Sequence, residues 1–143
     1  MERAKPIFYN FWRSGSSFRV RIALKWKNIE YENVSINTTK EGGFKQHSEE
    51  YTKLNPYNKI PTLIIDGQTL GESVAILEYL EETRKERPLL PAEPKNRAKV
   101  RQLVEIINSG IQPFMTGTAL GHITDLSGDV NTYTYNVYNQ SKT

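Results

Sequence analysis

The sequence contains no cysteine, which excludes a disulfide framework, a thiolate metal site and a thiol nucleophile supplied by the protein itself. Long apolar runs are also missing, since a stretch such as residues 63–65 is far too short to cross a bilayer. The first 20 residues hold several basic side chains and no apolar core of signal-peptide length. We therefore expect a soluble, cytoplasmic protein without a targeting segment, a metal site or a membrane partner.

A strong charge of one sign is absent too, because the formal net charge is only +3 with acids and bases interleaved along the chain. Basic residues do cluster between residues 13 and 27. A nucleic-acid surface requires a basic face with aromatic side chains between the charges. A solvated helix face with one or two anion-binding side chains is the simpler explanation of this cluster, so we expect no nucleic-acid partner.

Alternating β-prone and helix-periodic segments predict an α/β fold. The expected strands are residues 6–12, 31–36, 62–66 and 68–70, and the expected helices are residues 18–27, 44–54 and 73–84. The order βαβ, α, ββα requires a parallel strand pair with a right-handed crossover, followed by a hairpin and its helix. One small mixed sheet with helices on both faces satisfies this order, which is the thioredoxin-like architecture.

The segment from Asn55 to Leu63, followed by Glu72 and Ser73, predicts an edge that binds a peptide. Pro61 has no N–H to donate to a strand ladder, so the backbone of Ile60 is free to pair with something else. Ser73 places a hydroxyl and unpaired backbone N–H groups at a helix start, where a carboxylate is favourable. These features together predict a site for a small acidic peptide.

The run from Ser14 to Ser17 places hydroxyls at the start of the first helix. A hydroxyl donor and the positive end of a helix suit an anion supplied from outside, for example a thiolate. Holding an ordinary thiol half ionised at neutral pH requires lowering its pKa by about 1.5, or about 2 kcal/mol. One hydrogen bond and a helix terminus can supply this. The alternative is that these serines only cap the helix.

Residues 14–24 resemble the Ser-Ser-Cys-Ser-Trp-Arg-Val-Arg-Ile-Ala-Leu signature of zeta-class glutathione transferases, a class that includes maleylacetoacetate isomerase of tyrosine and phenylalanine catabolism. The resemblance covers about residues 5–114. Further segments that resemble this class, in order, are residues 55–56, 60–63, 65–67, 75–84, 89–91 and 110–113.

The resemblance implies glutathione as co-substrate. Ser14 would hydrogen-bond the glutathione sulfur, with Ser16 and Ser17 as further catalytic hydroxyls at the same helix end. The backbone of Ile60, before a cis Pro61, would pair with the cysteinyl part, and the γ-glutamyl end would meet Glu72 and Ser73. The full set of implied glutathione contacts is Ser14, Gly15, Ser16, Ser17, Phe18, Arg19, Gln46, Ile60, Glu72, Ser73 and Gln112.

The reaction that the resemblance implies is cis-trans isomerisation of maleylacetoacetate to fumarylacetoacetate, together with glutathione transferase activity. Arg13 and Arg19 are candidates to bind the dicarboxylate substrate, and their alternative is surface charge or a structural salt bridge. We expect His47 to be exposed and without a role, and we assign none to His122.

The sequence also departs from this class. Gly15 replaces a serine, and Ser16 replaces the signature cysteine, which predicts altered activity but not automatic loss. Phe18 replaces a tryptophan, which we expect to change packing only. The resemblance stops near residue 114, where the class continues with a longer helical domain. We therefore expect a glutathione-binding domain at residues 1–86, the start of a truncated helical domain at 92–115, and a divergent, poorly ordered tail at 116–143.

Two functional hypotheses remain open. The first is a zeta-class enzyme, and the second is a non-catalytic glutathione-binding module, or truncated isoform, that pairs with full-length subunits. Relatives dimerise through both domains, so a homodimer is uncertain for this chain. Truncation would also leave the apolar face of an expected helix at 96–109 exposed. A disulfide oxidoreductase is disfavoured because there is no cysteine.

Overall fold

The computed structural model describes residues 4–39 and 44–116, together with 119, 123 and 126. The expected tail at 116–143 and His122 lie almost wholly outside the described residues. The chain divides into two compact units, Met1–Leu90 and Pro91–Thr143. Each unit is described by itself below.

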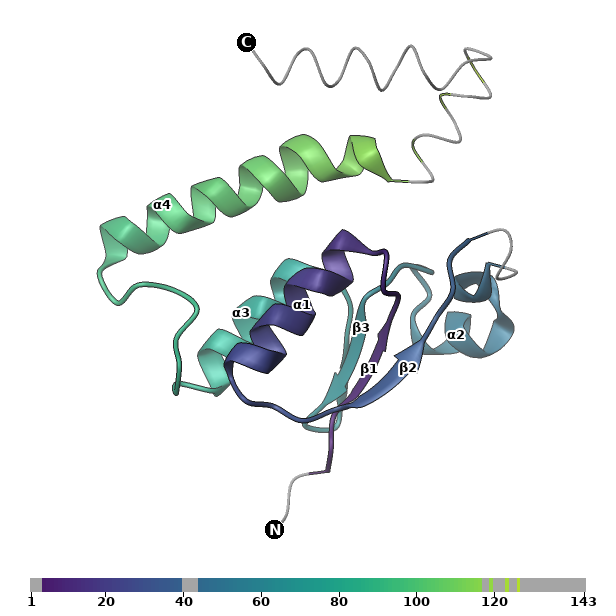
Figure 1. The fold of residues 1–143 in the computed structure, drawn as a ribbon, viewed down its shortest axis with the longest axis horizontal. Helices are drawn as coiled ribbons and strands as arrows, with labels where there is room; N and C mark the ends of the chain where they lie inside the picture. Colours follow the sequence, from purple (N-terminus) through teal and green to yellow (C-terminus); the bar gives the residue numbers. More distant parts are fainter. Residues whose placement is uncertain (1–3, 40–43, 117–118, 120–122, 124–125, 127–143) are drawn as a thin grey trace. The chain divides into compact units, whose positions relative to one another are not determined.

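A four-stranded mixed sheet forms the centre of the first unit (Figure 1). Its order is β2-β1-β3-β4, with β1 parallel to β2 and antiparallel to β3. Asp66 and Gly67 form the β3–β4 hairpin, and both have positive φ, as that turn requires. The strands are β1 (Ile7–Asn10), β2 (Glu32–Ser35), β3 (Thr62–Ile65) and β4 (Gln68–Leu70).

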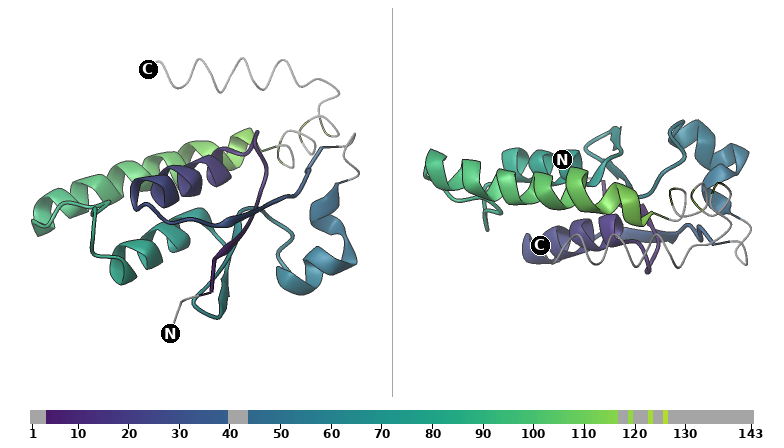
Figure 2. Two further views of the ribbon diagram at one scale, coloured as in Figure 1. Left: turned by 60° about the horizontal axis from the view of Figure 1, so that its bottom comes forward. Right: turned by 90° about the horizontal axis from the view of Figure 1, so that it is seen from above.

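Helices cover both faces of this sheet. The helices are α1 (Gly15–Trp26), α2 (Glu49–Leu54) and α3 (Ser73–Thr83). In Figure 1, α1 and α3 lie side by side against the sheet, and Figure 2 shows α2 apart from this pair. Phe8 packs in the core beneath α1 and α3, whereas its neighbour Tyr9 meets Tyr51 of α2, with ring centroids 6.0 Å apart. Adjacent strand residues point to opposite faces, so the predicted thioredoxin-like architecture is confirmed.

The core of the first unit lies between β1, β3 and the α1–α3 pair. Its fully buried members share an apolar character and come from both helices and both central strands. They are Phe8, Val20, Ala23, Leu24, Leu63, Ile65, Ile76 and Leu80. Burying each large apolar side chain contributes about 1.5–3 kcal/mol, so this cluster holds α1 and α3 against the sheet.

The prediction of one helix at residues 44–54 is wrong in one respect, because this segment forms two separate helical elements. A short 3₁₀ turn, η1 (Lys45–His47), precedes α2, and Ser48 between them is extended. The Ser48 side chain accepts a hydrogen bond from the Tyr51 N–H at 3.2 Å. A serine in this role starts a new helix instead of continuing the old one.

The second unit begins with α4 (Pro94–Glu105), two residues earlier than expected, because Glu93 caps the N–H groups of Lys95 and Asn96. The helix continues through a π-helical stretch, η2 (Ile106–Ile111), and a 3₁₀ turn, η3 (Gln112–Met115). The prediction of exposed apolar side chains in this region is confirmed, most clearly for Leu103 at 61% exposure. None of the described helices is long and apolar enough to cross a membrane.

Candidate functional site

Three of the predicted site segments lie at one edge of the sheet. Antiparallel pairing of β1 with β3 places Tyr9 opposite Thr62, so the chain leaving β1 meets the chain entering β3. The chain leaving β1 leads into the start of α1 (Figure 1), and the chain entering β3 contains Ile60 and Pro61. β2 runs parallel to β1 and ends at the same edge, so the segment leading to η1 also starts there. The topology therefore gathers the predicted residues of the first unit.

Ser14 is the N-cap of α1. Its Oγ accepts a hydrogen bond from the Ser17 N–H at 3.1 Å, and the residue is half-buried. The expected capping role is therefore present. Capping uses a lone pair of the hydroxyl oxygen, however, and the O–H proton stays available to donate. The two interpretations of this serine are thus compatible.

The other residues of the first helical turn differ in accessibility. Gly15 is exposed and Ser16 is half-buried. Ser17 is 0% exposed, and its Oγ has no hydrogen-bond partner among the described residues. Phe18 is exposed and carries the Arg21 guanidinium over its ring, 5.4 Å from the centroid. Ser14 and Ser16 are accordingly the hydroxyls that a ligand can reach, while Ser17 lies inside the unit.

Ile60 offers its backbone at the start of β3. The Ile60–Pro61 peptide is cis, as expected. Among the described residues, no hydrogen bond outside the regular helices and strands uses the N–H or C=O of Ile60. Ile60 is half-buried and Pro61 is buried. This backbone has the free donor and acceptor that an added strand requires.

The start of α3 has two unusual features. Glu72 precedes it with φ 58° and ψ 116°, outside the regions that non-glycine residues ordinarily occupy. No side chain caps the first N–H groups of this helix. Such backbone strain costs about 1–3 kcal/mol and is concentrated at binding sites. Unpaired N–H groups at a helix start favour an anion.

Arg19 connects α1 with the start of α3. Its Nη1 donates to the Ser73 Oγ at 3.1 Å, and Ser73 is only 3% exposed. Burial lowers the pKa of the Arg19 guanidinium, which still stays charged at neutral pH. Arg13, in contrast, is exposed and lies over the Trp12 ring at 5.7 Å. The two arginines predicted to bind a dicarboxylate substrate therefore have different surroundings.

The two predicted glutamines lie in different units. Gln46 is in η1, and its Oε1 is buried without a hydrogen-bond partner among the described residues. His47 beside it is exposed, as expected. Gln112 begins η3 in the second unit. The first unit alone thus brings together the predicted residues before residue 90, and the role of Gln112 stays a prediction.

Sequence reasoning missed a polar cluster behind Ile60. The Tyr51 hydroxyl lies 2.7 Å from both the Lys59 carbonyl oxygen and the Thr62 Oγ1. The Asn55 Nδ2 donates to the same two acceptors, at 2.8 and 2.9 Å. The available signal was a tyrosine on the buried side of an otherwise polar helix, since a buried Tyr hydroxyl requires a partner.

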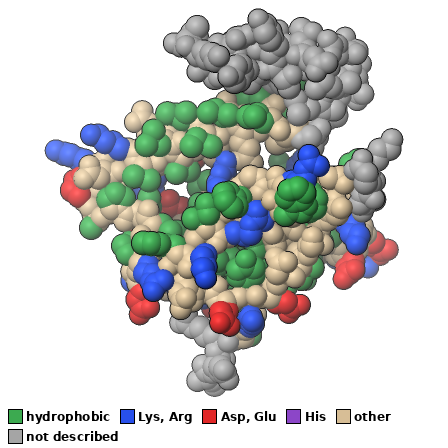
Figure 3. Space-filling model, viewed as in Figure 1, with side chains coloured by type: hydrophobic (Ala, Val, Ile, Leu, Met, Phe, Trp, Pro, Cys, Tyr) green, Lys and Arg blue, Asp and Glu red, His purple; other side chains and the backbone are tan. Residues whose placement is uncertain are grey.

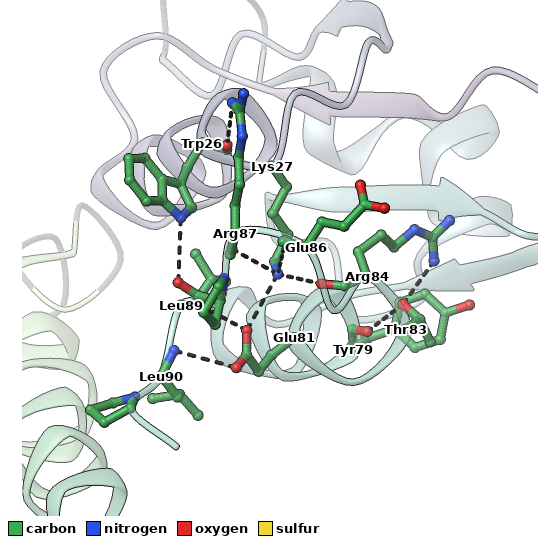
Figure 4. Close-up of polar contacts among 12 residues, drawn as sticks. Trp26, Lys27, Tyr79, Glu81, Thr83, Arg84, Glu86, Arg87, Leu89 and Leu90 are labelled. Carbon is green, nitrogen blue, oxygen red and sulfur yellow. Dashed lines mark hydrogen bonds and ion pairs between the residues drawn. The ribbon is translucent and has the colours of Figure 1, made fainter. Parts of the chain in front are cut away.

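A second missed cluster lies at the opposite ends of α1 and α3, where Lys27 is buried (Figure 4). Its Nζ lies 3.3 Å from the Glu81 Oε2 and 2.7 Å from the Arg84 carbonyl oxygen. Glu81 also accepts from the N–H groups of Leu89 and Leu90. Burial raises the pKa of the Glu81 carboxyl, but these hydrogen bonds and Lys27 outweigh it and hold the pKa below its ordinary value.

Apolar and basic side chains alternate on the face of the first unit seen in Figure 3. Between the end of β1 and the end of α1, the large exposed apolar side chains are Trp12, Phe18, Ile22 and Trp26, each more than half exposed. Three of them repeat at every fourth residue along α1, which places them in one stripe. No group of three or more metal-ligating side chains occurs among the residues that the structure describes.

The comparison with protein families gives one match that covers most of the first unit. Residues 8–88 match the family model described as "Glutathione S-transferase, N-terminal domain". This segment contains the sheet except for Ile7, the three helices α1–α3 and every predicted site residue except Gln112.

Curated relatives are similar over most of this chain but are longer. A maleylacetoacetate isomerase of Dictyostelium discoideum is 51% identical over 129 residues, which are 90% of this chain and 58% of the relative. A maleylacetoacetate isomerase of Rattus norvegicus is 51% identical over 123 residues, which are 86% of this chain and 56% of the relative. The chain thus spans a little more than half the length of these relatives.

Solved structures of similar proteins agree with the family match and with the curated relatives. A maleylacetoacetate isomerase from Methylobacterium extorquens AM1, crystallised with malonate and GSH, has a TM-score of 0.84 and 34% identity, covering 94% of this chain and 64% of that one. A bacterial zeta-class maleyl pyruvate isomerase has a TM-score of 0.82 and 34% identity, covering 89% of this chain and 60% of that one. The chain belongs to the glutathione S-transferase family, and its relatives place it with the zeta class.

Proposed function

We propose that this chain binds glutathione at the sheet edge formed by Ser14, Ile60 and the start of α3. We further propose that it serves the glutathione-dependent isomerisation of maleylacetoacetate to fumarylacetoacetate, with glutathione transferase activity. The observation that carries the proposal is the free backbone of Ile60 at the edge where the capping hydroxyl of Ser14 lies. Relatives named maleylacetoacetate isomerase, one of them crystallised with GSH, support it.

The proposed binding mode uses a different chemical group for each part of the tripeptide. The cysteinyl backbone pairs with Ile60 as an added strand would. The carboxylate of the γ-glutamyl end meets the uncapped N–H groups at Ser73, and its ammonium group meets the carboxylate of Glu72. Arg19 holds the Ser73 side chain in place from α1. Gln46, a half-buried residue of η1, is a further candidate contact through its side-chain amide.

Ser14 has the central chemical role in this proposal. With its oxygen already accepting from the Ser17 N–H, the hydroxyl donates its proton to the glutathione sulfur. A charge-assisted hydrogen bond and the positive end of α1 both favour the thiolate. Ser16 at the same turn is a second reachable hydroxyl in place of the class cysteine. These groups lower the pKa of the thiol toward neutrality.

The proposed reaction conserves glutathione. The thiolate adds to one carbon of the conjugated cis double bond, and the electron pair moves onto the neighbouring carbonyl as an enolate. The former double bond is now single and rotates. The enolate then re-forms the double bond in the trans arrangement and expels the thiolate. Arg13 is a candidate to bind a carboxylate of the substrate, because it is exposed near Ser14 in the sequence.

A non-catalytic glutathione-binding module that pairs with longer subunits is the second candidate. The observation that favours it is the exposed apolar series in the second unit, in which Leu103, Ile106 and Ile107 are each at least half exposed. Exposed apolar patches mark surfaces that pair with another protein. Sedimentation of the purified chain distinguishes a homodimer from a monomer that pairs only with longer subunits. A cytoplasmic location belongs to both candidates, and cell fractionation tests it.

The decisive experiment measures glutathione binding and thiolate formation with the 143-residue chain. We expect weak binding by calorimetry and a thiolate absorbance band on binding, with turnover of maleylacetone slow or absent. Ser14→Ala is expected to remove most of the thiolate band, because the hydroxyl donor is lost. Ser109→Ala is the control, since it removes an exposed serine hydroxyl that bonds only locally, to Glu105 at 2.6 Å in the second unit.

The outcomes separate the hypotheses. An unchanged thiolate band in Ser14→Ala would remove Ser14 from the mechanism. Rapid turnover of maleylacetone by this chain would favour the enzyme over the non-catalytic module. Lack of glutathione binding by the parent chain would reject both candidates.

A further inference from the structure

Four hydrogen bonds form a closed ring between α2 and the segment that contains Ile60. Tyr51 within α2 and Asn55 at its C-cap are one helical turn apart, and each contacts the same two groups. These groups are the Lys59 carbonyl oxygen and the Thr62 Oγ1, at distances between 2.7 and 2.9 Å. Lys59 and Thr62 flank the Ile60–Pro61 pair on either side. The ring therefore fixes both ends of the segment that offers its backbone to a ligand.

The donors in this ring can be assigned because each has a limited number of protons. The Asn55 Nδ2 has two protons, one for the Lys59 carbonyl and one for the Thr62 Oγ1. The Tyr51 hydroxyl has one proton, which goes to the Lys59 carbonyl. Thr62 consequently donates its own proton to the Tyr51 oxygen. Every N–H and O–H proton of the ring then has an acceptor, which makes such a network rigid.

Burial supports this assignment. Tyr51 is 3% exposed and Thr62 is 0% exposed, so water does not compete for these groups. Burial also raises the pKa of the Tyr51 phenol, so that it stays protonated and keeps its donor at every pH of interest. Tyr51 has no direct access to a ligand in this position. Its influence must pass through the backbone that it holds.

We propose that Tyr51 is a positioning residue for glutathione, which acts by holding the N–H and C=O of Ile60 in line for the cysteinyl backbone. This inference rests on the proposed function and deepens it, because it assigns a role to a residue outside the predicted site. The alternative is that Tyr51 only packs α2 against the sheet, since its ring lies 6.0 Å from that of Tyr9. Removing the hydroxyl alone separates these roles, because Phe keeps the ring.

The first experiment compares Tyr51→Phe with Tyr57→Phe by calorimetry. Tyr57 undergoes the same chemical change but is 67% exposed and outside the ring. One ligand is glutathione, and the other is glutathione methylated on the cysteinyl amide nitrogen, which cannot donate to Ile60. We expect Tyr51→Phe to weaken glutathione binding about three- to tenfold and the methylated ligand much less. An equal loss for both ligands would show that Tyr51 does not act through Ile60.

A second pair of variants tests the ring at Thr62. Thr62→Ser keeps the hydroxyl and is expected to keep the affinity for glutathione. Thr62→Val keeps the shape without the hydroxyl and is expected to weaken it about as much as Tyr51→Phe. Equal affinity for the Ser and Val variants would overturn the role of the ring.

A ligand-free measurement keeps failure of this proposal distinct from failure of the proposed function. The ¹⁵N order parameter of the Ile60 amide reports how firmly this backbone is held. We expect it to fall in Tyr51→Phe and to be unchanged in Tyr57→Phe. An unchanged value in Tyr51→Phe overturns the positioning role, whereas lack of glutathione binding by the parent chain overturns the proposed function.

Discussion

Replacing Lys27 by Met tests how much the buried ion pair at the far ends of α1 and α3 stabilises the first unit. The Lys27 side chain is fully buried, and Met matches its length without the charge. The change leaves the carboxylate of Glu81 buried without its counter-charge, and it leaves the Arg84 carbonyl, now 2.7 Å from the Nζ, without that donor. Removing one partner of a buried pair costs about 3–5 kcal/mol.

The size of this loss makes it easy to measure. Each kcal/mol lowers the melting temperature of a domain of this size by about 4–8 °C, so Lys27→Met is expected to lower it by at least about 12 °C. Urea unfolding followed by circular dichroism gives the free energy directly. Lys25→Met is the matched control, because Lys25 is exposed on the same helix. We expect it to change the free energy of unfolding by no more than about 0.5 kcal/mol.

A double variant shows whether the cost comes from the unpaired charge. In Glu81→Gln the single side-chain oxygen can still accept from the Leu89 N–H, which makes the shorter of the two bonds, while the bond from the Leu90 N–H is lost and no charge remains. Lys27→Met combined with Glu81→Gln is therefore expected to be more stable than Lys27→Met alone. Equal stability of the Lys27→Met and Lys25→Met variants would refute the reasoning, as would a double variant that loses the sum of both single effects.

Two further predictions concern the same helices. The pKa of Glu81 in the folded state lies below its ordinary value of 4.5, so the folded protein binds this proton less readily than the unfolded chain does. The free energy of unfolding is therefore expected to fall as the pH drops below about 4.5, and less steeply in Glu81→Gln; parallel pH curves would contradict this. Glu72→Gly relieves a strain of about 1–3 kcal/mol and is expected to keep or raise the urea midpoint while weakening glutathione binding. A lower midpoint with unchanged affinity would contradict the strain argument.

Local patterns were sufficient to predict most of the first unit. Apolar spacing predicted α1 and α3, and Asp66-Gly67 predicted the hairpin. The break before α2 was also predictable, because Ser48 followed by two glutamates is a common helix start. The free backbone of Ile60 followed from Pro61 alone. These features depend on neighbours within a few residues, which is the range that sequence patterns describe.

The contacts that sequence patterns missed join residues that are far apart in the sequence. Lys27 and Glu81 are 54 residues apart, and so are Arg19 and Ser73. Lys27 fitted the helical spacing of the core, but no pattern shows which carboxylate a buried lysine will meet. Arg19 and Ser73 were each predicted at the site without the bond between them. Such pairings are set by how α1 packs on α3 and not by either helix alone.

The polar groups at the C-terminal ends of α1 and α3 are satisfied within the protein, whereas several at the N-terminal ends are not. This contrast supports placing the proposed site at the N-terminal ends. At the C-terminal ends, Lys27 and Glu81 satisfy one another and the carbonyl and N–H groups of the segment that follows α3. At the N-terminal ends, Glu72 is strained, α3 is uncapped, and Ser14 retains a proton to donate. Unsatisfied groups are costly unless a ligand completes them. The buried pair at the far end holds α1 and α3 together. We therefore predict that Lys27→Met weakens glutathione binding, measured by calorimetry on the folded variant, as well as stability.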